Sequence, residues 1–108
     1  MNLLFVCSMN KWRSPTAEAI FKNHHLYHAK SAGVSESARI KLTKKMIDWA
    51  DLIFVMERNH KQRLLKMYPS AYTKKEIIVL EIADDYQFMD PELIEIIKQS
   101  VVPYLNDL

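Results

Sequence analysis

Hydrophobic residues gather in four short runs along the chain, and polar segments separate them. Three runs are rich in Leu, Ile, Val and Phe, at residues 3–6, 52–56 and 77–80, and a fourth, more mixed run at 28–32 ends at Gly33. Short, continuous apolar runs are typical of strands that are buried on both faces of a sheet. The pattern therefore predicts four strands.

Between and after these runs, apolar positions recur every three to four residues. This spacing predicts four helices, at residues 14–27, 43–50, 58–68 and 91–105. Ser14 suits the N-cap of the first helix, and Pro15 suits its first position. Pro103 leaves the last turn of the fourth helix open.

The alternation of strand and helix predicts an α/β fold. We expect a single domain over residues 1–108 with three layers, α/β/α, around a four-stranded parallel sheet. A hydrophobic content of 49% and a charged content of 26% are near the globular average and argue against disordered and fibrous classes. Ligands of such sheets bind beyond the carboxyl ends of the strands, so the loop of residues 7–13, after the first strand, is where we expect function.

The numbers of cysteines and glycines and the length of the apolar runs exclude several classes of protein and site. Cys7 is the single cysteine, which excludes an internal disulfide and a multi-cysteine zinc site and favours a reducing, cytoplasmic location. With one glycine, the chain has no Gly-rich nucleotide-binding loop. The longest apolar runs are about five residues, so we expect no membrane span and no secretory signal. His24 and His28 have metal-ligand spacing but no acidic or cysteine partner nearby, so we expect neither metal nor cofactor.

Charge is distributed unevenly along the chain. Residues 1–75 carry 14 Lys and Arg against 5 Asp and Glu, whereas residues 76–108 carry 1 against 8. The split is consistent with two solvated faces and also with a basic face for an anionic ligand, and the sequence leaves both open. The basic segment 58–66 has few aromatic neighbours, so we do not expect a nucleic-acid partner.

The segment from Cys7 to Pro15 carries the candidate chemistry. A thiol follows a buried strand, and Arg13 and the hydroxyl of Ser14 stand at the expected helix start. Backbone N–H groups of such a loop can converge on an anion, and an Arg side chain can bind two oxygens of a tetrahedral oxyanion. The positive potential of these N–H groups and of the Arg side chain also favours the thiolate form of Cys7. One loop would then bind a phosphate and aim a nucleophile at its phosphorus; a buried structural cysteine is the alternative interpretation.

This Cys-x5-Arg-Ser-Pro core, within residues 3–21, resembles the low-molecular-weight protein tyrosine phosphatases. Ser31-Ala32-Gly33, residues 50–57 and Asp90-Pro91 are similar to further segments of that family. The resemblance implies a phosphatase that hydrolyses phosphomonoesters, including phosphotyrosine in proteins, through a cysteinyl-phosphate. It implies a phosphorylated protein or a small phosphoester as partner, and anions such as phosphate or sulfate at the loop of residues 7–13.

The resemblance also implies roles for single residues. Cys7 would be the nucleophile, Arg13 would hold the phosphoryl group, and Ser14 would stabilise the thiolate and help it leave. Asp90 would protonate the leaving oxygen and then activate water. An Asp before a Pro is also a common helix N-cap, and Asp84 and Asp85 are rival acids on a nearby loop.

The loop residues between strand and helix would bind the substrate: Ser8, Met9, Asn10, Lys11, Trp12 and Arg13. The resemblance gives Asn10 a further role, which is to hold the shape of the loop. Asn tolerates a positive φ better than most residues, and this matters in a loop without glycine.

The chain departs from the family at several positions. Met9 stands where the family usually has Gly, Trp12 where it often has a second Cys, and Glu92-Leu93 where it commonly has aromatic residues beside the phosphotyrosine ring. Trp12, Tyr86 and Phe88 are candidates to replace those ring contacts. Two other functions therefore stay open: a phosphate-binding regulatory module with little turnover, and an arsenate reductase that depends on a partner thiol.

Overall fold

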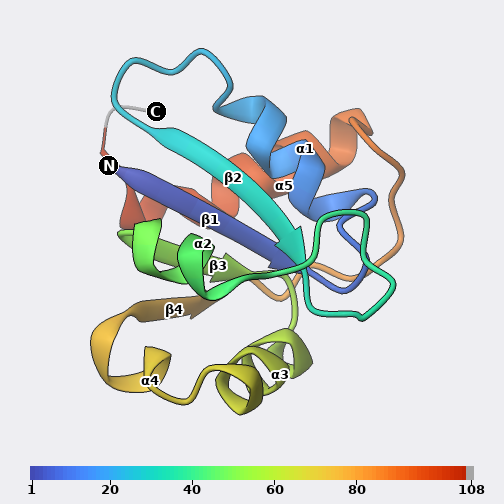
Figure 1. Cartoon of the computed structure of the whole chain (residues 1–108). Coiled ribbons are helices and arrows are strands. Elements are labelled where there is room, and N and C mark those ends of the chain that lie inside the picture. The colour runs from blue at the N-terminus through green and yellow to red at the C-terminus, as the bar shows by residue number, and fades with distance from the viewer. Residues whose placement is uncertain (107–108) are drawn as a thin grey trace.

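A computed structural model describes residues 1–106 of the chain and places four parallel strands in one sheet, in the order β2-β1-β3-β4 (Figure 1). The strands are β1 (Asn2–Cys7), β2 (His28–Gly33), β3 (Leu52–Val55) and β4 (Glu76–Val79). The helices are α1 (Arg13–Ile20), α2 (Lys44–Trp49), α3 (Arg58–Met67), α4 (Ala71–Lys74) and α5 (Pro91–Val101), with the 3-10 helix η1 (Val102–Tyr104). The predicted α/β class with a four-stranded parallel sheet is confirmed.

Both faces of the sheet are covered by helices (Figure 1). Along β1, Leu3 and Phe5 pack with residues of α1 and α5, whereas Leu4 and Val6 pack with residues of α2 and α3. This follows from the alternation of side chains along a strand. Because each face is buried, the strand reads as an uninterrupted apolar run in the sequence. None of the helices within residues 1–106 is long and apolar enough to cross a membrane.

Helix α1 is shorter than predicted, because it ends at Ile20 instead of residue 27. The next residue, Phe21, leaves the helix and stacks on the buried ring of Phe5, with 5.8 Å between ring centroids. Tyr27 is also buried, and its hydroxyl bonds to the backbone of Asn106. Because these two rings are buried, the chain turns after Ile20, where helical spacing alone predicts that the helix continues.

The start and end of other elements also differ from the prediction. Helix α1 begins at Arg13, and Ser14 is inside it instead of capping it, because the Ser14 hydroxyl is engaged in the interior by Cys7. The single turn α4 was not predicted. After Val101 the last turn is the 3-10 helix η1, which contains Pro103 near its start.

The strand order places the carboxyl ends of β1 and β3 side by side near the middle of the sheet. From β1 the chain passes into α1 on one face, and from β3 it passes into α3 on the other face (Figure 1). The loops after the two strands therefore diverge and leave a gap at the switch point, which is where parallel sheets bind ligands. Cys7 is the last residue of β1 at this point.

Candidate active site

A cavity of about 250 Å³ opens at the carboxyl ends of the strands. It is lined by Cys7, Ser8, Met9, Lys11, Trp12, Arg13 and Asp84. Cys7 ends β1, Arg13 begins α1, and the other lining residues lie in the loop between them, except Asp84, which follows β4. The structure thus brings the predicted nucleophile, the predicted phosphate-binding Arg and four further predicted loop residues around one cavity.

The Cys7 sulfur lies within hydrogen-bond distance of the Ser14 hydroxyl, with 2.9 Å between Sγ and Oγ. The Asn10 amide donates to the same Ser14 oxygen at 2.9 Å and to the Ser31 hydroxyl at 2.9 Å. Ser31 in turn donates to a carboxylate oxygen of Glu18 at 2.6 Å. Ser14 accepts from Asn10, and its own proton can be donated to the sulfur or to the Ala32 carbonyl oxygen, which lies 3.4 Å from Oγ. The predicted contact between Ser14 and a thiolate has the required geometry.

Asn10 holds the loop from inside and does not line the cavity. Its side chain is fully buried, and its φ of 54° is the left-handed conformation that the sequence analysis expects of it. The loop also presses closely on Gly33, where an added Cβ would lie 2.5 Å from the Ser8 carbonyl oxygen and 3.0 Å from the Asn10 nitrogen. A glycine at this place lets the loop fold back against β2.

Arg13 is held by groups that follow β3 and β4. Its side chain is 3% exposed, and Nη1 donates to the Glu57 carboxylate at 2.5 Å and to the Ile82 carbonyl at 2.8 Å. Nε lies 3.5 Å from a carboxylate oxygen of Asp84. These contacts orient the guanidinium and leave Nη2 as the donor for a bound oxyanion. The sequence analysis missed Glu57 as a partner of Arg13, although its place directly after a buried strand was a signal.

His60 is a second residue that the sequence analysis missed. It is fully buried, its Nδ1 accepts from the Glu57 backbone N–H at 3.0 Å, and its Nε2 lies 2.9 Å from the Ser8 hydroxyl oxygen. Burial and the nearby charge of Arg13 lower the pKa of His60 to about 4. The ring is therefore neutral at pH 7, with its proton on Nε2 and directed at Ser8.

Asp90 and Asp84 occupy different places relative to the cavity. The Asp90 carboxylate caps α5, where it accepts from the Glu92 N–H at 2.9 Å, and Asp90 is not among the residues that line the cavity. Its neighbour Met89 donates its N–H to the Thr16 hydroxyl at 2.9 Å, which ties this loop to the start of α1. Asp84 is the carboxylate that lines the cavity. The catalytic role of Asp90 stays a prediction.

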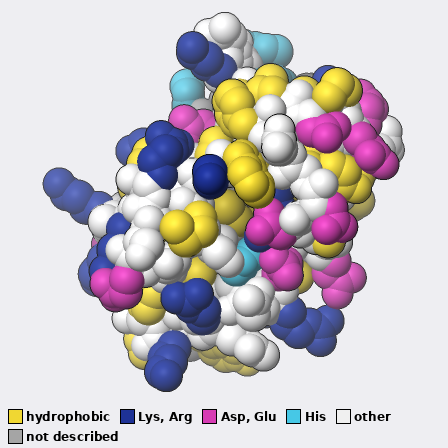
Figure 2. All heavy atoms as spheres, turned by 90° about the vertical axis from the view of Figure 1, so that its right-hand side faces the viewer, with side chains coloured by type: hydrophobic (Ala, Val, Ile, Leu, Met, Phe, Trp, Pro, Cys, Tyr) yellow, Lys and Arg dark blue, Asp and Glu magenta, His cyan; other side chains and the backbone are white. Residues whose placement is uncertain are grey.

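The wall of the cavity combines apolar and charged side chains. Trp12 lines it, and the Lys11 ammonium lies 4.8 Å from the centroid of the Trp12 ring. Of the other candidates for ring contacts, Phe88 lines a neighbouring hollow and Tyr86 packs against the core. Asp and Glu side chains gather on one side of this face of the molecule, and Lys and Arg gather on the other (Figure 2). Within residues 1–106, no three His, Cys, Asp or Glu side chains cluster as a metal site would require.

Comparison with known proteins identifies similar sequences and structures. The family model described as low molecular weight phosphotyrosine protein phosphatase matches residues 2–48. A protein-arginine-phosphatase from Geobacillus stearothermophilus is 32% identical over 96 residues, which covers 67% of this chain and 65% of the relative. The match therefore spans less than two thirds of that curated relative.

Solved structures resemble the whole fold. The low molecular weight protein tyrosine phosphatase from T. tengcongensis is 26% identical, with a TM-score of 0.69 over 93% of this chain and 92% of the other. A mutant of YwlE from Bacillus subtilis is also 26% identical, with a TM-score of 0.63 over 93% of this chain and 88% of the other. Both similarities extend well beyond residues 2–48.

Proposed function

The chain belongs to the low molecular weight phosphotyrosine protein phosphatase family, and we propose that it hydrolyses phosphomonoesters through a cysteinyl-phosphate on Cys7. One observation carries the proposal: Cys7 and the buried Arg13 line a single cavity, and the Ser14 hydroxyl contacts the Cys7 sulfur from the interior. A structural cysteine would not need an arginine that two loops hold beside it. In this proposal the reaction uses no metal and no cofactor.

In the first step, the Cys7 thiolate attacks phosphorus. The P–S bond forms, the P–O bond to the leaving group breaks, and the leaving oxygen takes a proton from a carboxylic acid. Arg13 and the loop N–H groups stabilise the charge on the three remaining phosphoryl oxygens. Asp90 is the acid by family resemblance, and Asp84 is the rival because it lines the cavity.

In the second step, water attacks the phosphocysteine. The new P–O bond forms, the P–S bond breaks, and the same carboxylate takes the proton of the water. Ser14 stands 2.9 Å from the sulfur and donates to it as it leaves, so the free thiolate is regenerated beside inorganic phosphate.

We propose a phosphorylated protein as the physiological substrate, with phosphotyrosine and phosphoarginine as the two forms to compare. With phosphoarginine the first step breaks a P–N bond instead of a P–O bond, and the leaving guanidine nitrogen takes the proton. The family is named for phosphotyrosine, and a relative is named for phosphoarginine. The carboxylates around Arg13 support the second form. Glu57 and Asp84 both lie beside Arg13, and Asp84 also lines the cavity, where a carboxylate can pair with the guanidinium of a phosphoarginine.

Hydrolysis of two aryl phosphates tests the mechanism. We expect the wild type to hydrolyse both p-nitrophenyl phosphate and phenyl phosphate, and Cys7→Ser to abolish both activities. Loss of the acid should slow phenyl phosphate about 100-fold and p-nitrophenyl phosphate much less, because the poorer leaving group needs the proton more. Asp90→Asn should show this pattern, and Asp84→Asn should not. The reverse result would assign the acid to Asp84.

A wild type that binds phosphate but hydrolyses no more aryl phosphate than Cys7→Ser would contradict the enzyme and favour the regulatory module. The substrate form is tested with peptides that carry phosphotyrosine or phosphoarginine in the same sequence. If Asp84 recognises a guanidinium, Asp84→Asn should lower kcat/KM for the phosphoarginine peptide more than for the phosphotyrosine peptide. Equal losses would remove the support that Asp84 gives to phosphoarginine.

A further inference from the structure

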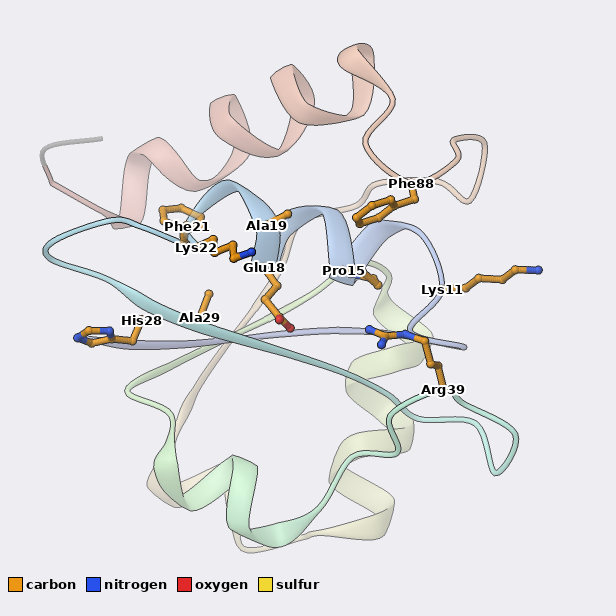
Figure 3. Close-up of a pocket in the computed structure, with 10 residues that line it drawn as sticks. All are labelled: Lys11, Pro15, Glu18, Ala19, Phe21, Lys22, His28, Ala29, Arg39 and Phe88. Carbon is orange, nitrogen blue, oxygen red and sulfur yellow. The ribbon is translucent and has the colours of Figure 1, made fainter.

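A second, larger hollow lies between α1 and β2, beside the Cys7 cavity. We call it the α1–β2 groove; its volume is about 580 Å³, and its lining includes Lys11, Glu18, Lys22, His28, Arg39 and Phe88. Figure 3 shows Lys22 and His28 toward one end and Lys11, Arg39 and Phe88 toward the other. Lys11 also lines the Cys7 cavity, so a ligand that is bound at Cys7 can continue past Lys11 into the groove.

The side chains that line the α1–β2 groove carry more positive than negative charge. Lys11, Lys22 and Arg39 contribute three cations, and none of them forms a salt bridge within residues 1–106. Glu18 is the one acidic residue of the lining, and its carboxylate accepts from the Ser31 hydroxyl at 2.6 Å. With three cations and one carboxylate, the lining of the groove carries a net positive charge.

Arg39 links the groove to the loop that surrounds Cys7. Its Nε donates to the Asn10 carbonyl at 3.0 Å, and its backbone N–H donates to the Met9 carbonyl at 2.9 Å. Phe88 adds an apolar edge, since 54% of this side chain is exposed beside the cations. Cations along a hollow with an apolar edge suit a polypeptide segment that carries carboxylates.

We propose that the α1–β2 groove binds an acidic segment of the phosphorylated protein whose phosphoryl group occupies the Cys7 cavity. This inference rests on the proposed function for the position of the phosphoryl group. Acidic side chains on the substrate would face Lys22 and Arg39. Asp84 lines the Cys7 cavity and not the groove, so acidic side chains of the substrate would be favoured along the groove and repelled at that side of the cavity.

A binding experiment separates this inference from catalysis. The Cys7→Ser protein is titrated with fluorescent peptides that carry phosphotyrosine or phosphoarginine, flanked on both sides by three Asp or by three Asn, and anisotropy gives Kd. In at least one series we expect the Asp peptide to bind about tenfold more tightly than the Asn peptide at low salt, and we expect the difference to shrink in 1 M salt.

Charge reversal at a lysine of the groove tests whether the tighter binding of the Asp peptide arises there. Lys22 is exposed and stands outside the Cys7 loop, so Lys22→Glu, added to Cys7→Ser, should raise Kd for the Asp peptide roughly fivefold or more and leave the Asn peptide nearly unchanged. Lys22→Gln should give a smaller effect. Lys45→Glu is the matched control, because Lys45 is an exposed lysine in α2 whose reversal changes the net charge equally. Thermal unfolding by circular dichroism confirms that each variant is folded.

The outcomes distinguish the two proposals. Absence of aryl phosphate hydrolysis would contradict the proposed function alone, since peptide binding is measured without turnover. The groove inference would be overturned if the Asp and Asn peptides bound equally in both series. It would also be overturned if the preference for the Asp peptide survived Lys22→Glu, or if Lys45→Glu removed that preference to the same extent. A single-stranded oligonucleotide that binds more tightly than the Asp peptide and depends on Lys22 would also overturn it, in favour of nucleic acid.

Discussion

The buried ring of His60 should make the stability of this protein depend on pH. The ring is fully buried between Glu57 and Ser8, its Nδ1 is used as an acceptor, and Arg13 is close. Its pKa is about 4 in the folded chain, whereas an unfolded chain has a histidine pKa of about 6.5. The unfolded chain therefore takes up the proton more readily. The full stability is present above pH 6.5 and is lost as pH falls from 6.5 toward 4.

The magnitude follows from the difference between the two pKa values of His60. A difference of about 2.5 units corresponds to about 3 kcal/mol of unfolding free energy when both states are fully protonated. At pH 5 the unfolded histidine is almost fully protonated and the folded one is mostly neutral, so about 2 kcal/mol is already lost. This is a large share of the stability of a small domain.

Urea unfolding at pH 7.5 and pH 5.0, followed by tryptophan fluorescence, measures the effect. The His60→Gln variant keeps an amide that can donate to Ser8 and has no charge to gain. We expect the wild type to lose about 2 kcal/mol more than His60→Gln between the two pH values. His25→Gln, at an exposed histidine, is the control and should behave as the wild type does. The same pH dependence in the wild type and in His60→Gln would refute the reasoning.

Substitutions at three further positions test the loop around Cys7. Glu57→Gln removes the carboxylate that orients Arg13, and we expect kcat/KM for p-nitrophenyl phosphate to fall about 10- to 100-fold; an unchanged value would contradict the positioning role. Gly33→Ala places a Cβ 2.5 Å from the Ser8 carbonyl oxygen. We expect the free energy of unfolding in urea to fall by about 2 kcal/mol and phosphate binding to weaken. Wild-type values for both would show that the loop can move aside. Asn10→Ala and Asn10→Gly both lose two hydrogen bonds, but the φ of 54° carries a steric cost only for Ala. We expect Asn10→Ala to be about 1 kcal/mol less stable than Asn10→Gly in urea unfolding. Equal stabilities of the two variants would show that the backbone carries no strain at this position.

The sequence alone determined the class of the fold and the place of the Cys7 loop. Apolar runs mark the four strands because their side chains are buried on both faces, and this property is local to each segment. Alternation with helices implies parallel strands, and in a parallel sheet the loop after β1 must lie at the carboxyl edge. The left-handed conformation of Asn10 was also predictable, because it depends on the residue type and the loop.

Only the tertiary structure decided which groups meet that loop. Strand order and register bring the end of β3 beside the end of β1, and so Glu57 reaches Arg13 and His60 reaches Ser8 across 44 and 52 residues of sequence. No periodicity within a segment carries such information, because it depends on how the separate loops pack. For the same reason, the early end of α1 at Ile20 depends on aromatic rings elsewhere in the core. The α1–β2 groove is likewise a product of packing, since a helix and a strand that come together in the fold are what place Lys22 and Arg39 along one hollow.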